Sequence, residues 1–310
     1  MKYIYAFDMS NDVRKTSHSG SWYSRDGNRL NRELDSWIAK ALKHTLQPSN
    51  VKAIISPHAG YSYCGSTAAY AYAAINPSKI QRVFILGPSH HEYINGCALS
   101  SLNYYGTPLY NLKIDQTTNN ELHSSGLFTK MSTHVDEAEH SIEMQLPFLA
   151  KVMERFPSNF QVIPVLVGAI NTQQEVAYGK LFSNYLLKED VLFVISSDFC
   201  HWGERFQYTH CNDKFTQIFK SIEDLDHQGM QHIEALDFTG FTSYLKKTKN
   251  TICGRHPIAI LLAAIDSIKA QLSNPTLKFV NYSQSNQLES SLSISSSDVG
   301  GNCLAPFVFS

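Results

Sequence analysis

Residues 53–65 read AIISPHAGYSYCG, and this stretch decides the fold. Its apolar, β-branched start predicts a buried strand, which ends at Pro57 because proline cannot donate a hydrogen bond to a sheet ladder. His58 and Gly60 follow, and the run from Ser66 to Ala74 is typical of a helix. Open α/β sheets bind ligands beyond the carboxyl ends of their strands. We therefore expect His58 to lie at a ligand-binding edge.

The same order of strand, chain-breaking residue and histidine recurs further along the chain. Residues 82–87 (RVFILG) predict a second buried strand, and Pro-Ser leads from it to His90. The most strand-like run, residues 191–197, ends directly before Asp198, and His201 follows. Because parallel strands end at one edge of a sheet, these side chains are expected to gather there.

The remaining sequence alternates between strand and helix patterns without an internal repeat. Helices are predicted at 30–46, 136–155, 175–187, 213–223, 228–236, 238–247 and 257–270, and strands at 161–167, 277–282 and 304–309. Pro164 indicates an edge strand or a bulge, and Pro147 indicates a kink or an early break. This alternation predicts one three-layer αβα domain over residues 1–310, with a flexible segment at 1–13 and an exposed serine-rich loop at 283–298.

Composition excludes several classes of function. The chain has 310 residues, 43% hydrophobic and 17% charged, with a net charge of −1, which gives no basic patch for nucleic acid. No apolar run approaches the roughly 20 residues that cross a bilayer, so no membrane insertion is expected. Six cysteines without a CxxC motif, and the lack of a signal-peptide core, indicate reduced thiols in the cytoplasm, with the nucleus as the alternative.

A metal site is one explanation for the residues at the strand ends. Imidazole and thiolate suit zinc, copper and iron, and His58, His90 and Cys253 would leave an open position for a reactant. Asp198 and His201, three residues apart, suit a carboxylate that orients an imidazole or shares the metal with it. The alternative is that these are structural histidines and an inert thiol, and spacing alone leaves both open.

Several motifs together closely resemble the Memo family (mediator of ErbB2-driven cell motility). They are HSGSWY at 18–23, PHAGY at 57–61, LGPSHH at 86–91, EHSIE at 139–143, SSDFCHWG at 196–203 and CGRHP at 253–257. The resemblance runs from about residue 14 to the end of the chain. It implies a single αβα domain with a central mixed sheet, similar to the class III extradiol ring-cleaving dioxygenases, in which two histidines and a carboxylate hold Fe(II).

The resemblance also implies roles for individual residues. His58 and His90 match the two histidine ligands, and His201 matches the histidine that acts as acid and base. Cys253 stands where the carboxylate ligand would be, and thiolate favours Cu(I) or zinc over Fe(II), which argues against ring cleavage. The family implies copper binding, with iron as a second candidate. It also implies copper-dependent redox activity that makes reactive oxygen species, phosphotyrosine-peptide binding and a link to cell migration or invasive growth.

Three further residues are candidates for the mouth of the pocket. Trp22, Tyr63 and Arg205 would place a cation beside aromatic rings, which suits a phosphotyrosine or an aromatic acid. His140 and Glu143 lie one helical turn apart. For these two residues, a helix-capping role is favoured over a role in supporting the metal ligands.

The motifs and the family resemblance lead to three candidate functions. The preferred one is a metal-dependent redox protein that reacts with dioxygen. The alternative is a non-catalytic adaptor that binds a phosphotyrosine or signalling-protein partner in a vestigial pocket. A weaker alternative is a zinc hydrolase, because three ligands and a water molecule also suit hydrolysis. The sequence makes no prediction of oligomeric state.

Overall fold

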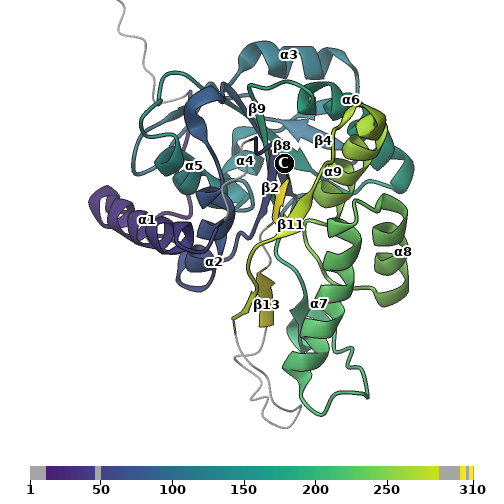
Figure 1. The fold of residues 1–310 in the computed structure, drawn as a ribbon. Helices are drawn as coiled ribbons and strands as arrows, with labels where there is room; N and C mark the ends of the chain where they lie inside the picture. Colours follow the sequence, from purple (N-terminus) through teal and green to yellow (C-terminus); the bar gives the residue numbers. More distant parts are fainter. Residues whose placement is uncertain (1–11, 46–49, 286–300, 305–306, 310) are drawn as a thin grey trace, which may run out of the picture.

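The computed structural model of the chain describes residues 12–45, 50–285, 301–304 and 307–309. Its centre is an eight-stranded mixed sheet (Figure 1). In order across the sheet, the strands are β11 (Leu277–Phe279), β14 (Phe307–Phe309), β2 (Ala53–Ser56), β9 (Val191–Ser196), β3 (Arg82–Pro88), β8 (Gln161–Val167), β4 (Cys97–Leu99) and β7 (Phe128–Lys130). The strands β2, β9, β3 and β8 are parallel, whereas β14 and β4 pair antiparallel with β2 and β8.

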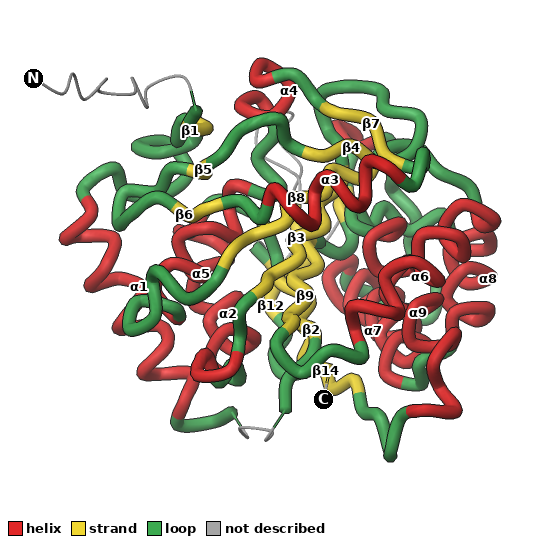
Figure 2. Tube along the Cα trace, turned by 90° about the horizontal axis from the view of Figure 1, so that it is seen from above, coloured by secondary structure: helices red, strands yellow, loops and turns green. Residues whose placement is uncertain are grey.

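Helices cover both faces of this sheet, as the view from above shows (Figure 2). The helices are α1 (Gly27–Leu42), α2 (Tyr61–Ala73), α3 (Gln116–Ser124), α4 (Thr133–Ala138), α5 (Leu146–Val152), α6 (Thr172–Leu186), α7 (Ile218–Glu234), α8 (Phe238–Thr248) and α9 (Arg255–Ile268). One face carries α1, α2 and α5, and the other carries α6, α7, α8 and α9. No helix within the described ranges is both long and apolar enough to span a bilayer.

Two short sheets lie beside the main one. The first joins β1 (Val13–Arg14), β5 (Tyr104–Tyr105) and β6 (Leu112–Lys113). The second joins β10 (His201–Trp202), β13 (Gly301–Leu304) and β12 (Ser283–Gln284). The second sheet therefore holds the segment that follows Asp198.

The core has two halves because successive side chains of a strand point to opposite faces of the sheet. In β9, Phe193 and Ile195 pack into the half beneath α6 and α9, whereas Leu192 and Val194 pack into the half beneath α2 and α5. All residues of β9 are buried. This two-sided burial explains why the central strands are apolar runs without alternation.

The predicted three-layer α/β fold is confirmed, with a correction at Pro164. This residue does not lie in an edge strand, because β8 has β3 on one side and β4 on the other. The pairing with β4 starts only at Val165, and Val162 bridges instead to Ile114. The proline therefore occupies a gap in the ladder, where its missing N–H is tolerated.

Two predicted helical regions also differ from the structure. The predicted helix at 136–155 is interrupted, because α4 ends at Ala138 and the 3₁₀ turn η3 (Glu143–Gln145) leads into α5, where Pro147 lies in the first turn. The two helices predicted at 213–223 and 228–236 are one helix, α7. The helix continues through residues 224–227, and at Gly229 it packs so closely on the ring of Tyr244 that a Cβ atom would have no room. Most of the segments at 1–13 and 283–298 lie outside the described residues.

A buried ion-pair network attaches the segment before α1 to the domain. The guanidinium of Arg14, 1% exposed, donates to Asp136 Oδ1 at 2.9 Å and to Glu143 Oε2 at 2.6 Å. It also donates to the backbone carbonyls of Asp136 and Glu139, and Tyr105 donates its hydroxyl to Asp136 at 2.6 Å. All these charges are away from water, so each depends on its partners.

We predict that Arg14→Ala lowers the free energy of unfolding by about 3–5 kcal/mol, because it leaves two buried carboxylates without their cation. Urea unfolding at neutral pH measures this. Arg29→Ala is the matched control, since it removes an exposed arginine paired with Glu33 on α1 and should change stability little. Equal effects of the two variants would contradict the prediction.

Candidate metal centre

The pairing of β2 with β9 brings His58 and Asp198 together. Ser56 and Ser196 are opposite each other at the ends of these two strands. Just beyond them, the backbone N–H of His58 donates to Asp198 Oδ1 at 2.8 Å. His58 is 2% exposed and Asp198 is 1% exposed. Asp198 therefore fixes the loop that carries His58.

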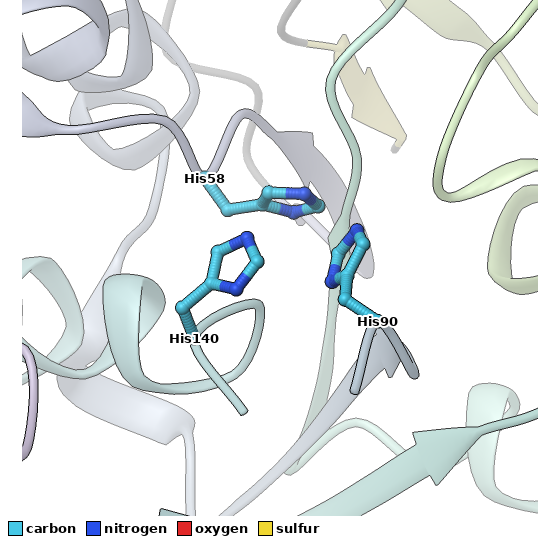
Figure 3. Close-up of side chains that lie close together, drawn as sticks. All are labelled: His58, His90 and His140. Carbon is cyan, nitrogen blue, oxygen red and sulfur yellow. The ribbon is translucent and has the colours of Figure 1, made fainter. Parts of the chain in front are cut away.

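Three imidazoles converge at this edge of the sheet (Figure 3). His58 follows β2, His90 follows β3, and His140 lies between α4 and η3. One ring nitrogen from each of them lies within 4.8 Å of the others. The rings of His90 and His140 are stacked with their centroids 4.4 Å apart. Among the residues that the structure describes, this is the group with the spacing of a metal site.

Hydrogen bonds at Nδ1 orient these rings. Glu139 Oε1 lies 2.9 Å from His90 Nδ1 and 3.3 Å from His140 Nδ1. A carboxylate only accepts hydrogen bonds, so the Nδ1 atom of His90 carries the proton and its Nε2 atom keeps a lone pair. Ser196 Oγ donates to the carbonyl of Ser141 at 2.7 Å, so it accepts from His58 Nδ1 at 2.7 Å. The Nε2 atom of His90 is then available as a ligand, and the Nε2 atom of His58 faces the Sγ atom of Cys253.

The electrostatics favour the neutral forms of His58 and His140. Burial, with the repulsion of His90, holds the pKa of His58 well below its usual value. Burial and the neighbouring His58 and His90 lower the pKa of His140 to about 2. Burial alone would raise the pKa of Glu139, but the hydrogen bond from His90 and the nearby imidazoles hold this pKa far below its usual range. Neutral imidazoles beside an ionised carboxylate are the states that metal binding requires.

Cys253 contacts one of these histidines without joining the group of three. Its Sγ atom lies 3.1 Å from His58 Nε2 and accepts from the backbone N–H of Asp198 at 3.1 Å. Burial, with the charge of Asp198, raises the pKa of the Cys253 thiol far above its usual value. The protonated thiol donates to His58 Nε2. Ligation by Cys253, predicted from the sequence, stays a prediction.

His201 lies on β10, beside Asp198 and His58. Its backbone N–H donates to Thr251 Oγ1 at 2.7 Å, and its ring lies 5.0 Å from the ring of Phe206. Burial raises the pKa of Asp198, and the charge of His201 opposes this shift. This proximity is compatible with the predicted acid and base role of His201, which stays a prediction.

Of the three residues predicted at the pocket mouth, Trp22 is close to the histidines. Its ring centroid lies 4.6 Å from that of His140. Tyr63 is 60% exposed, and Arg205 is exposed with its guanidinium 5.8 Å from the ring of Phe206. The contacts of the described residues do not join Tyr63 or Arg205 to Trp22. A shared aromatic and cationic mouth stays a prediction.

His140 belongs to the candidate metal-binding group, although the sequence does not predict it there. The helix-capping role favoured from the sequence is wrong, because Ser132 caps α4 and Ile142 occupies the N-cap position of η3. The useful signal was the pair Glu139-His140 in a run of acids that ends before a proline. If those acids are taken as buried hydrogen-bond acceptors and not as the charged first turn of a helix, they predict histidine and arginine partners.

Glu143 holds the N-terminal segment against the site. Its carboxylate accepts from the backbone N–H and Nδ1 of His18, both at 2.9 Å, from the Tyr23 hydroxyl at 2.7 Å and from Arg14. The ring of His18 lies 5.9 Å from that of His140. These contacts place His18 and Trp22 over the histidine group.

The fold and this site define a three-layer α/β protein with a group of three histidines whose spacing suits a metal ion. The sequence profile described as Memo-like protein matches residues 14–301, so the chain belongs to that family. It is 52% identical to Protein MEMO1 of Mus musculus over 284 residues, which covers 91% of this chain and 95% of that protein. It is 52% identical to Protein MEMO1 of Homo sapiens over 281 residues, covering 90% and 94%.

More distant relatives were also found. The chain is 45% identical to Protein memo-1 homolog of Caenorhabditis elegans over 292 residues, which covers 93% of this chain and 82% of that protein. Among solved structures, an uncharacterized protein from Escherichia coli K12 is similar at 10% identity and a TM-score of 0.45, with 83% of this chain and 99% of that chain covered. The family assignment depends on the sequence matches alone.

We predict that Glu143 makes the protein acid-sensitive. Burial alone would raise its pKa, but hydrogen bonds from His18 and Arg14 and the charge of Arg14 lower it from 4.5 to about 2. The unfolded chain therefore binds the proton more tightly. At 1.36 kcal/mol per pKa unit, the lowered pKa of Glu143 contributes at most about 3 kcal/mol to the free energy of unfolding. This contribution is complete above pH 4.5 and is lost as the pH falls toward 2.

Urea unfolding between pH 2 and 7 measures this dependence. Glu143→Gln should flatten the slope below pH 4.5, whereas Glu33→Gln, which changes an exposed carboxylate, should leave it unchanged. Glu139, whose pKa is also held far below its usual range, leaves a smaller slope in Glu143→Gln, and a slope as steep as that of the wild type would contradict the prediction.

Proposed function

We propose that this protein binds a redox-active transition metal ion through Nε2 of His58, His90 and His140, and that the bound metal reacts with dioxygen. The observation that carries the proposal is the set of three converging imidazoles whose Nδ1 atoms are already hydrogen-bonded to, or face, Ser196 and Glu139. Such outer partners fix the tautomer and orientation that a metal ligand needs.

The burial of the three rings supports an accessible metal rather than an enclosed structural one. The side chain of His90 is 27% exposed and that of His140 is 14% exposed, whereas His58 is 2% exposed. Solvent therefore reaches one side of the group. Three protein ligands with an open fourth position are typical of reactive metal sites.

The donor set favours copper among the candidate metals. Iron oxygenase sites use two histidines and one carboxylate. Here the Glu139 carboxylate faces Nδ1 of His90 and His140, and the three grouped nitrogen atoms all come from histidines. Three imidazole ligands suit copper, iron and zinc, and the proposed reaction with dioxygen requires one of the two redox-active metals. Iron is the second candidate, and zinc would support the hydrolase alternative.

The remaining residues then have supporting roles. When bound, the metal supplies electron transfer to dioxygen. Glu139 and Ser196 hold the imidazoles, Trp22 shields one side of His140 from water, and His201 is placed to hold or move a proton near Asp198. A cytoplasmic protein that acts in motility or invasive-growth signalling through a signalling partner is the biological setting we propose, on the basis of the family resemblance. The peptide-binding adaptor is the alternative.

We predict about one copper ion per chain after reconstitution of the metal-free protein, measured by elemental mass spectrometry. Loss of one of three ligands in His140→Ala should lower copper affinity at least 100-fold, and Glu139→Gln should lower it about 10- to 100-fold, the usual effect of an outer partner. His123→Ala, which removes an exposed histidine on α3, is the matched control and should bind like the wild type.

Cys253→Ser distinguishes the two ligand sets. If the three histidines are the ligands, this variant retains its copper, whereas ligation by the thiolate requires copper loss in Cys253→Ser and retention in His140→Ala. Oxygen consumption with ascorbate as reductant should follow copper content across the variants. Stoichiometric copper without oxygen consumption would contradict the redox part of the proposal.

A further inference from the structure

Gln145 places a buried amide next to the histidine group. It is the last residue of η3, in the turn that follows His140, and it is 1% exposed. Burying an amide is costly unless its hydrogen bonds are made within the protein. An apolar side chain would fill the same space without this cost, so the partners of the amide indicate what it does.

The nitrogen of this amide binds groups at the ends of two central strands. Its Nε2 atom donates to the carbonyl of Pro57 at 3.0 Å and to Ser196 Oγ at 2.9 Å. Pro57 directly precedes His58, and Ser196 is the last residue of β9. A carbonyl only accepts hydrogen bonds, so the contact with Pro57 shows which end of the amide is the nitrogen.

The oxygen of the amide is held from α2. The hydroxyl of Tyr72, which is fully buried, donates to Gln145 Oε1 at 2.9 Å. The amide therefore cannot turn over without losing hydrogen bonds on both sides, and its Nε2 atom stays directed at Pro57 and Ser196.

The hydroxyl group of Ser196 transmits this restraint to His58. A hydroxyl has one proton and two lone pairs. The proton goes to the carbonyl of Ser141 at 2.7 Å, one lone pair accepts from Gln145, and the other accepts from His58 Nδ1 at 2.7 Å. Both the loop before His58 and the acceptor of its ring are thus held by the same amide.

We propose that Gln145 is a positioning residue of the candidate metal centre, which holds the His58 ring in place through Pro57 and Ser196. Gln145 and His140 belong to the same turn, so the amide also links the positions of the two imidazoles. Their ring centroids lie 5.4 Å apart, and the rings converge in Figure 3. The role in metal binding rests on the proposed function, whereas the restraint on His58 does not.

The ring N–H of His58 tests this restraint without a metal. The ring is 2% exposed and its Nδ1 proton is donated to Ser196, so the proton exchanges with water only when the site opens or the whole chain unfolds. Nuclear magnetic resonance of the metal-free full chain, labelled with ¹⁵N at histidine, measures the exchange rate. The variant His58→Ala identifies the signal by its loss.

Gln145→Met replaces the amide with an apolar side chain of similar length. We expect the His58 N–H to exchange at least about 10-fold faster than global unfolding allows, because Pro57 and Ser196 lose their shared donor. Tyr244→Phe is the matched control, since it removes a buried hydroxyl that donates to the carbonyl of Leu225 in the other half of the core. It should speed exchange only as far as its loss of stability in urea requires.

Copper affinity tests the link to the metal. Gln145→Met should bind copper about 10-fold more weakly than the wild type, as expected for an outer partner, whereas Tyr244→Phe should bind like the wild type. Tyr72→Phe is the milder variant if Gln145→Met does not fold. It removes the donor to Gln145 Oε1 and should change the exchange rate and the copper affinity in the same directions, by about 3-fold.

Two results would overturn the proposal. The first is a His58 exchange rate that follows global stability in every folded variant, which would leave Gln145 with a structural role alone. The second is faster exchange with unchanged copper affinity, which would show that the restraint on His58 does not serve the metal. If the wild type binds no copper, the proposed function fails, and the exchange rates alone decide whether Gln145 positions His58.

Discussion

The carboxylate of Glu139 is the interaction on which the candidate metal centre depends. It lies close to Nδ1 of two imidazoles and accepts from the backbone N–H groups of His90 and Ser141, at 2.6 and 2.8 Å. One buried charge thereby fixes the loop after β3 and the turn after α4 at the same time. The break in the helical run around residue 139 is what allows this carboxylate to face the histidines rather than solvent.

The N-terminal segment is part of the same arrangement. Arg14 joins Asp136 to Glu143, and Glu143 in turn holds His18 and Tyr23. Asp136 is therefore paired with Arg14 and with the hydroxyl groups of Ser100 and Tyr105, whereas all the partners of Glu143 named here come from residues 14–23. A change in this segment reaches the histidine group through shared buried carboxylates, although the segment itself provides none of the three grouped nitrogen atoms.

The sequence predicted the layers well because the central strands are continuous apolar runs, and it placed His58 and His90 at the correct edge because parallel strands end together. It did not predict His140 or the broken helix. Arg14 and Asp136 are 122 positions apart, and a local pattern cannot show that an acid has such a partner. A local pattern also cannot show the partner of Gly229 in α7. This glycine packs against the ring of Tyr244 on α8, and that contact outweighs the weak helix propensity of glycine.

The position of β14 has a kinetic consequence. It lies between β11 and β2, and it pairs Phe309 with Ala53 and Val308 with Ile54 on the strand that leads to His58. Contacts between such distant parts of a chain form late in folding, since the loop that they close is long. Until then β2 presents an apolar, unpaired edge, which a second copy of the chain can join. The strand that leads to the candidate metal centre is thus also where misassembly during refolding would start.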